Sequence, residues 1–129
     1  MWKKKSVAVI LPAYNEQGNI QTAIADFRTV THHDGTPVVD EILVIDNNSS
    51  DRTANLARAK GARVVKEKKQ GYGHALRRGL KNAETEIIVL CEPDGTFVAD
   101  DVIKLLSYSE DFDMVCGTRT TRELLFKEA

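Results

Sequence analysis

Two carboxylates stand two residues apart in residues 91–96 (CEPDGT), a spacing that suits a bound metal ion. Proline and glycine favour an extended turn, in which the side chains of Glu92 and Asp94 can point the same way. Carboxylate oxygens are the ligands that Mg²⁺ and Mn²⁺ prefer, so both residues are candidate metal ligands. An ordinary acidic turn is the alternative, and the motif alone leaves both interpretations open.

Two further segments offer groups that could bind a nucleoside. Residues 12–16 (PAYNE) begin with Pro12, which ends an apolar run, and continue with the flat ring of Tyr14 for a base and the carboxylate of Glu16 for ribose hydroxyls. Asp46 closes a second apolar run, and its carboxylate can accept the N3–H of uracil or the amino and imino hydrogens of guanine. In the alternative interpretation, these polar residues only cap the helices that follow.

Glycine and arginine residues suggest where phosphate groups could bind. Gly71 and Gly73 stand at the start of a helical pattern, where backbone amides can approach an anion. The pattern is not the dinucleotide-binding fingerprint, because Leu76 occupies the place of its third glycine. Arg119 could hold a phosphate through two parallel hydrogen bonds, although it could equally be a solvated surface charge, as could Arg122.

The hydrophobic pattern predicts the elements that position these motifs. It favours strands over residues 6–11, 41–45, 62–66, 86–91 and 112–116, and helices over residues 17–30, between Asp51 and Gly61, over 72–83 and over 99–108. Apolar strands that alternate with helices indicate an α/β fold with a doubly wound, mostly parallel sheet and helices on both faces. Ligands bind such sheets at the carboxyl ends of the strands, where the candidate motifs lie.

The composition indicates one globular domain over residues 1–129, with 42% apolar and 29% charged residues. The net charge of −1 argues against a nucleic-acid surface. No apolar run approaches the roughly 18 residues that a membrane span needs. Cys91 and Cys116 end apolar runs and are expected to be buried free thiols in a reducing, cytoplasmic setting. Lys3, Lys4 and Lys5 form a solvated chain end or a contact with a membrane surface.

Together, these motifs resemble the family 2 glycosyltransferases, inverting enzymes with the GT-A fold, over residues 6–120. Residues 12–16 resemble the opening nucleotide-binding motif of that family, and residues 46–53 resemble its Asp-Asp-Gly-Ser-x-Asp-x-Thr block. In that block Asn47 and Asn48 replace the second aspartate and the glycine. The Glu-Pro-Asp triplet at 92–94 resembles the Asp-x-Asp motif for metal and diphosphate, with glutamate as its first member.

The resemblance implies transfer of a hexose from a nucleoside-diphosphate sugar, with a UDP-sugar favoured over GDP-mannose and with Mg²⁺ or Mn²⁺ as cofactor. The stretches Gly71-Tyr72-Gly73 and Gly117-Thr118-Arg119 look most like the subgroup of dolichyl-phosphate mannosyltransferase, which implies a polyprenyl-phosphate acceptor at a membrane surface and a role in cell-envelope glycan synthesis. Asp94 and Arg119 would then be catalytic. The donor would be bound by Pro12, Tyr14, Glu16, Asp46, Gly71, Gly73, Glu92 and Asp94.

Domains of this family are usually considerably longer, so the chain is expected to be a nucleotide-sugar-binding domain truncated on its C-terminal side. The alternative is a non-catalytic nucleotide-sugar-binding module or an inactive fragment. An exposed last strand would also allow two copies to pair as a homo-oligomer. A sugar-nucleotide pyrophosphorylase is rejected, because that family carries Gly-Thr-Arg directly after its first strand and here it lies at 117–119. A phospho-receiver domain is disfavoured, because it needs an acidic pair after the first strand, where this chain has Pro-Ala-Tyr, and a lysine after the fifth.

Overall fold

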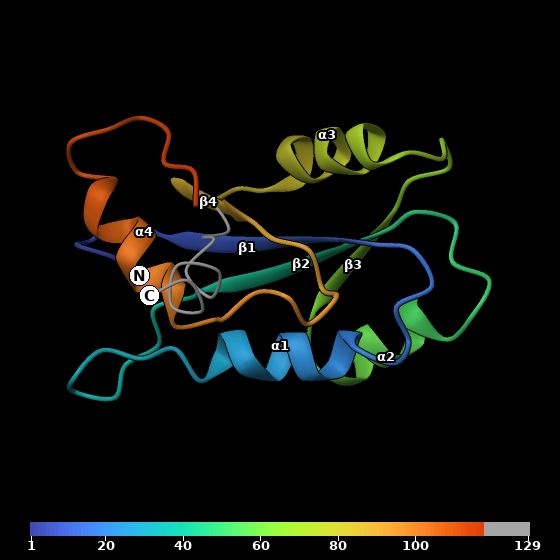
Figure 1. Cartoon of the computed structure of the whole chain (residues 1–129), viewed down its shortest axis with the longest axis horizontal. Coiled ribbons are helices and arrows are strands. Elements are labelled where there is room, and N and C mark those ends of the chain that lie inside the picture. Colours follow the sequence, from blue (N-terminus) through green and yellow to red (C-terminus); the bar gives the residue numbers. More distant parts are fainter. Residues whose placement is uncertain (118–129) are drawn as a thin grey trace, which may run out of the picture.

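The computed structural model describes residues 1–117 as a parallel sheet flanked by helices (Figure 1). The expected alternation of strands and helices is confirmed through the fourth helix. The elements are β1 (Val7–Ala13), α1 (Ile20–Arg28), β2 (Glu41–Asp46), α2 (Thr53–Ala59), β3 (Arg63–Lys66), α3 (Tyr72–Asn82), β4 (Ile87–Leu90) and α4 (Asp101–Tyr108).

The sheet has the strand order β3-β2-β1-β4, and all three strand pairs are parallel. Helices α1 and α2 cover one face and α3 covers the other, as Figure 1 shows. The sheet is therefore doubly wound, as the sequence predicts. The strand order reverses direction between β1 and β4, and α/β sheets of this kind bind ligands in the crevice beyond the strand ends at that point.

The central strands are continuous apolar runs because both of their faces are covered. All seven residues of β1 are buried, and five of the six residues of β2 are buried. Helix α1 adds Ile20, Ile24 and Phe27 to the core at helical spacing. This rigid centre fixes the positions at which the candidate motifs leave the sheet.

Three expectations about individual segments are wrong. Residues 112–116 form no strand, and Phe112 and Met114 are exposed, at 61% and 80%. Cys116 is exposed rather than buried, although both cysteines are free as expected. The apolar spacing of residues 72–83 predicts that Leu80 is buried with Ala75 and Gly79, but Leu80 is 48% exposed. Hydrophobicity alone did not reveal which side of these segments meets the sheet.

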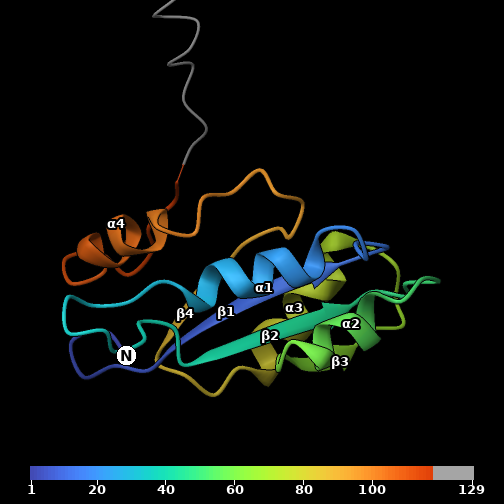
Figure 2. The same cartoon turned by 90° about the horizontal axis from the view of Figure 1, so that it is seen from below.

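Helix α4 lies at the end of the sheet near the N-terminus, apart from α2 (Figure 2). Lys3 Nζ is 3.0 Å from Glu110 Oε1, which joins the N-terminal turn to the end of this helix. Within residues 1–117, no helix has both the length and the apolar character needed to cross a membrane.

Candidate functional site

The predicted binding motifs meet at one end of the sheet, which we call the carboxyl edge. It consists of the strand ends and the loops that follow them, residues 14–19, 47–52, 67–71 and 91–100. Asn47 N donates to Ala13 O at 2.9 Å and Glu67 N donates to Asp46 O at 3.0 Å, so the first three loops begin side by side. They gather at the right of Figure 1, while the loop after β4 runs between α1 and α3.

Asp46 is a buried carboxylate at the end of β2, with only 4% of the residue exposed. Its Oδ1 accepts a hydrogen bond from Ser49 N at 3.0 Å. Burial of a carboxylate is costly unless polar partners compensate for the lost water. The buried position of Asp46 at this edge therefore makes it a candidate binding residue. Pro12, one residue before the end of β1, is also buried, and it pairs with Ile45 across the sheet.

Residues 14–17 and the loop after β2 are joined by hydrogen bonds in both directions. Asn15 N donates to Ser49 Oγ at 3.0 Å, while Ser50 N donates to Asn15 Oδ1 at 2.8 Å. Glu16 N donates to Thr53 Oγ1 at 2.9 Å. The polar residues of these two segments therefore brace the carboxyl edge.

The two donor-binding candidates after β1 differ in how they are held. Tyr14 is 53% exposed, so its ring is available to a ligand. Glu16 is half-buried and its Oε2 accepts from Asn19 Nδ2 at 3.2 Å. No side-chain hydrogen bond from the N-cap residue, Asn19, caps α1. Capping by that residue thus does not account for the polar character of this loop.

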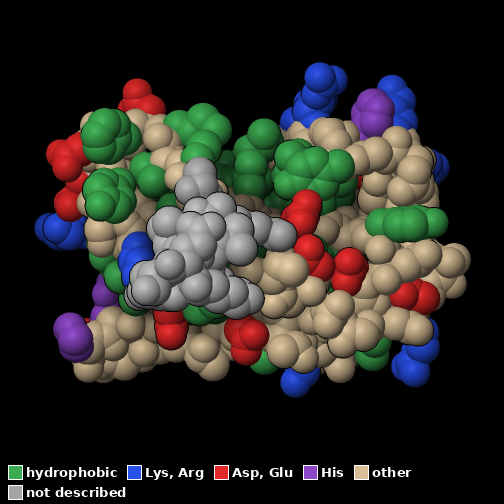
Figure 3. Space-filling view, in the orientation of Figure 1, with side chains coloured by type: hydrophobic (Ala, Val, Ile, Leu, Met, Phe, Trp, Pro, Cys, Tyr) green, Lys and Arg blue, Asp and Glu red, His purple; other side chains and the backbone are tan. Residues whose placement is uncertain are grey.

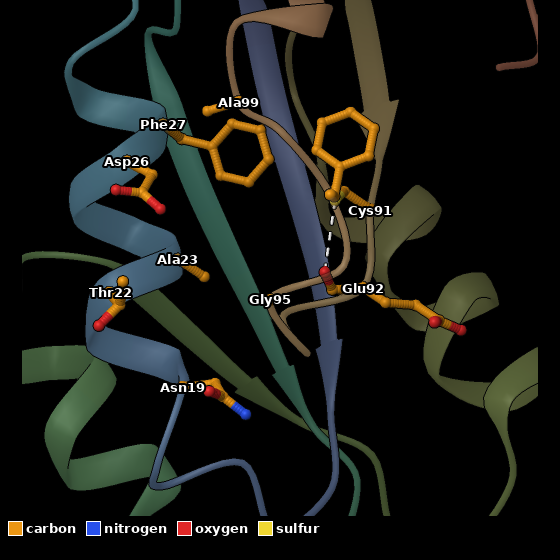
Figure 4. A pocket seen from close by; sticks show the side chains of 10 residues that line it. Asn19, Thr22, Ala23, Asp26, Phe27, Cys91, Glu92, Gly95 and Ala99 are labelled. Atoms are coloured by element: carbon orange, nitrogen blue, oxygen red, sulfur yellow. Dashed lines mark hydrogen bonds between the residues drawn. The ribbon is translucent and has the colours of Figure 1, made fainter. Parts of the chain in front are cut away.

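Glu92 and Asp94 follow β4 and lie on the loop that crosses the carboxyl edge. Glu92 is exposed, and its side chain extends toward α3 (Figure 4). Asp94 is half-buried, and its Oδ1 accepts from Thr96 N at 3.0 Å and Thr96 Oγ1 at 2.6 Å. Tyr72 begins α3 and is exposed as a residue, but partial burial of its hydroxyl, together with the nearby Glu92 and Cys91 side chains, raises its pKa. Glu92 therefore faces the same part of the molecule as the glycines that begin α3.

The chemistry of these donors suits a magnesium or manganese ion. Such ions are often held by one or two carboxylates, with water and substrate phosphates supplying the other ligands. Within residues 1–117, His, Cys, Asp and Glu form no group of three that could hold a metal without such help. Burial, and to a smaller extent the nearby Asp94 and Glu92 carboxylates, raise the pKa of Cys91 to about 12, so in the absence of a metal its thiol stays neutral near neutral pH.

A small cavity of about 150 Å³ lies between α1 and the loop after β4. Asn19, Asp26 and Phe27 line it from α1, and Cys91 lines it from the end of β4 (Figure 4). The rings of Phe27 and Phe97 stack there with centroids 5.8 Å apart. The carboxylate of Glu92 points away from this cavity and faces the α3 side of the loop.

The turn before α3 contains Gly71, which has a φ of +139°, a backbone conformation that glycine adopts far more readily than other residues. No side chain caps the helix that begins after it. Gly73 has open space around the position of a Cβ atom, so a ligand can approach its backbone closely. Figure 3 shows acidic side chains across the middle of the face and basic side chains along the top, over α3.

Sequence reasoning missed the structural importance of Asn47. This residue is 4% exposed, and its side chain binds the turn that precedes α3. The sequence shows that Asn47 replaces an aspartate of the family motif. It does not show the partners of the Asn47 amide, because they lie in a different loop. Arg119 and Arg122 lie outside the described residues, so their predicted roles remain predictions.

Relatives among known proteins match most of this chain. An uncharacterized glycosyltransferase of Mycobacterium tuberculosis is 36% identical over 115 residues, which are 88% of this chain and 49% of the relative. A dolichyl-phosphate hexose transferase of Haloferax volcanii is 33% identical over 117 residues, which are 90% of this chain and 49% of the relative. This chain thus spans about half the length of these curated relatives.

Among solved structures, glucosyl-3-phosphoglycerate synthase from Mycobacterium tuberculosis superposes with a TM-score of 0.71 and 31% identity. The match covers 82% of this chain and 40% of the synthase, which was crystallised with Mn²⁺, UDP and glucosyl-3-phosphoglycerate. The fold is that of a GT-A glycosyltransferase domain. More specifically, the chain belongs to glycosyl transferase family 2, whose family model matches residues 8–128.

Proposed function

We propose that this chain is the donor-binding domain of an inverting hexosyltransferase that uses a UDP-sugar, a divalent cation and a polyprenyl-phosphate acceptor. The observation that carries the proposal is the convergence of Asp46, Tyr14 and the Glu92–Asp94 pair on neighbouring strand ends beside the β1/β4 crevice. The enzyme would meet its lipid acceptor at the cytoplasmic surface of a membrane.

The nucleoside would be bound between the loops after β1 and β2. The buried Asp46 carboxylate can accept the N3–H of uracil, while the exposed Tyr14 ring can pack on the base. Glu16 can bind the ribose hydroxyls, and buried Pro12 would form the wall behind them. Asp46 could equally bind guanine, so the preference for UDP rests on the UDP complex of the synthase.

The diphosphate would lie between the turn that starts α3 and the loop after β4. Gly73 leaves its backbone accessible to phosphate oxygens, while Gly71, whose amide is held by Asn47, would place the turn beside them, and α3 presents the positive end of its dipole there. Asp94 and Glu92 would hold the cation, which when bound neutralises the negative charge that develops on the departing diphosphate. Mn²⁺ and Mg²⁺ both occur with UDP in structures of the synthase.

A phosphate acceptor would remove the need for a catalytic base. Its second pKa is about 6, so an acceptor oxygen is already anionic near neutral pH. That oxygen would attack the anomeric carbon from the face opposite UDP, forming one C–O bond as the bond to UDP breaks. The dolichyl-phosphate hexose transferase supports this acceptor class, and Arg119 is the proposed phosphate ligand.

The direct test is a transfer assay with the purified chain, Mn²⁺, labelled UDP-glucose and a polyprenyl phosphate in detergent. We expect a lipid-linked labelled sugar, and no product when 3-phosphoglycerate replaces the lipid. Donor binding without transfer to either acceptor would contradict a catalytic role and favour a non-catalytic nucleotide-sugar-binding module.

A further inference from the structure

Asn47 uses its buried side chain to hold the turn that leads into α3. Its Nδ2 donates to Glu67 O at 3.0 Å and Lys69 O at 2.8 Å. Its Oδ1 accepts from Gly71 N at 2.9 Å and from Gln70 Nε2 at 3.4 Å. With 4% of the residue exposed, water cannot readily replace these partners.

Asn48 extends the same contact with its own amide. Its Nδ2 donates to Lys68 O at 2.7 Å, so the carbonyls of three successive residues, 67 to 69, all point at asparagine amides. Asn48 has a φ of +64°, which asparagine tolerates better than most residues. The turn over residues 67–71 is therefore wrapped around the end of β2.

A carboxylate at position 47 could not make the same contacts. It could accept the hydrogen bond from Gly71 N, but an ionised carboxylate has no donor for the carbonyls of Glu67 and Lys69. Its second oxygen would face those two carbonyl oxygens at hydrogen-bonding distance. The amide donor, rather than the shape of the side chain, is what this turn requires.

The turn determines where α3 begins relative to Asp46. Gly71 is the residue before the first turn of α3, and Gly73 lies within that turn. Further along α3, Ala75 and Gly79 pack against the sheet and fix the rest of the helix. The contacts of residues 67–71 position its start, where the N-cap residue Gly71 makes no side-chain hydrogen bond.

We propose that Asn47 is a positioning residue of the donor site, which fixes the start of α3 beside Asp46 so that the backbone around Gly71 and Gly73 meets the diphosphate. This inference rests on the proposed function. It assigns Asn47 no contact with the donor and no part in the chemical step.

The test compares UDP binding by the parent chain and by the variant Asn47→Asp, measured calorimetrically with Mn²⁺ between about pH 5 and pH 8. At high pH we expect the variant to bind UDP roughly tenfold more weakly, because an ionised carboxylate repels the two carbonyls. At low pH the protonated carboxyl can donate one hydrogen bond, so its affinity should approach that of the parent.

The charged groups around position 47 are common to both proteins. Asp46 lies beside it on β2, Glu67 and Lys69 lie on the turn, and His74 and Arg78 of α3 lie near Glu67. Their own titration affects both pH profiles, so the comparison with the parent isolates the new carboxyl together with its coupling to these neighbours. Asn55→Asp, at an exposed position of α2, is the matched control and should follow the parent at every pH.

A variant with parent-like affinity throughout the pH range would overturn the positioning role while leaving the proposed function intact. Failure of the folded parent to bind UDP would overturn the proposed function itself. A ligand-free measurement covers the case in which Asn47→Asp does not fold: exchange of the Gly71 amide hydrogen in the parent, followed by NMR. We expect protection by Asn47 Oδ1, and rapid exchange would overturn the proposal.

Discussion

Asp46 and Asn47 are adjacent buried residues, but their side chains have different partners. Asp46 accepts from Ser49 within its own loop, whereas Asn47 binds the turn before α3. In the proposed site, Asp46 would contact the base and Asn47 would only position the backbone. Single-residue changes should therefore separate loss of a ligand contact from loss of geometry.

At the residue scale, the double variant Glu92→Gln, Asp94→Asn tests the metal ligands. Amide oxygens are poor substitutes for carboxylates toward Mn²⁺, but an asparagine can still accept from Thr96 and preserve the turn. We expect Mn²⁺ to lose its enhancement of UDP binding, by about tenfold or more, with little change in metal-free affinity. Calorimetry with and without Mn²⁺ measures both quantities.

The matched control for this variant is Asp111→Asn, Asp113→Asn. These two aspartates have the same spacing and are exposed, but they follow α4. Their replacement changes the net charge equally and should leave the Mn²⁺ effect intact. An undiminished Mn²⁺ effect in the Glu92 and Asp94 double variant would remove the metal assignment.

At the scale of elements, α3 approaches the sheet closely because Gly79 lacks a side chain. A Cβ atom there would lie 2.6 Å from Ile10 Cγ2 and 3.3 Å from Ile45 Cγ1. Both isoleucines are completely buried in the middle of the sheet and have little room to move. The absence of a side chain at Gly79 thus allows α3, which begins at the proposed diphosphate site, to pack closely on the sheet.

Gly79→Ala should destabilise the chain by about 1–3 kcal/mol, because the added methyl group overpacks the contact with β1 and β2. Gly73→Ala on the same helix meets open space and should instead be neutral or stabilising by about 0.5–1 kcal/mol through helix propensity. Urea unfolding followed by circular dichroism measures both changes. Equal stability of the two variants would contradict the close packing of α3.

The hydrophobic pattern predicts the central elements well because the buried strands are runs of consecutive apolar residues. The expected strand 41–45 ends one residue later, at Asp46, and the expected helix 17–30 narrows to Ile20–Arg28. Before that helix, Asn19 N and Ile20 N both donate to Glu16 O in a turn. Such differences at the ends of elements depend on individual hydrogen bonds.

The contacts between loops could not be predicted in the same way. Asn15 binds Ser50, and Asn47 binds Gly71, across separations of 35 and 24 residues. A motif shows that a polar residue is present, but the partner depends on how two strands are placed side by side. The prediction of a strand over residues 112–116 was wrong for a related reason, because an apolar stretch becomes a strand only beside another strand.

At the scale of the molecule, the sheet order places the end of β1 between those of β2 and β4. This order joins the proposed base-binding residues on one side with the proposed metal ligands on the other. It also explains how Tyr14, Asp46 and Asp94, which follow one another at separations of 32 and 48 residues in the chain, can serve one ligand. The donor-binding capacity of the described residues is therefore the central claim.

Calorimetric titration of the purified chain with UDP and with GDP, each with and without Mn²⁺, tests this claim most directly. We predict binding of UDP that strengthens with Mn²⁺ and that exceeds binding of GDP under the same conditions. Circular dichroism and cooperative unfolding of the same sample would establish that the purified chain is folded under the conditions of the titration. A folded chain that binds neither nucleotide in the presence of Mn²⁺ would contradict the assignment of the carboxyl edge as a donor site.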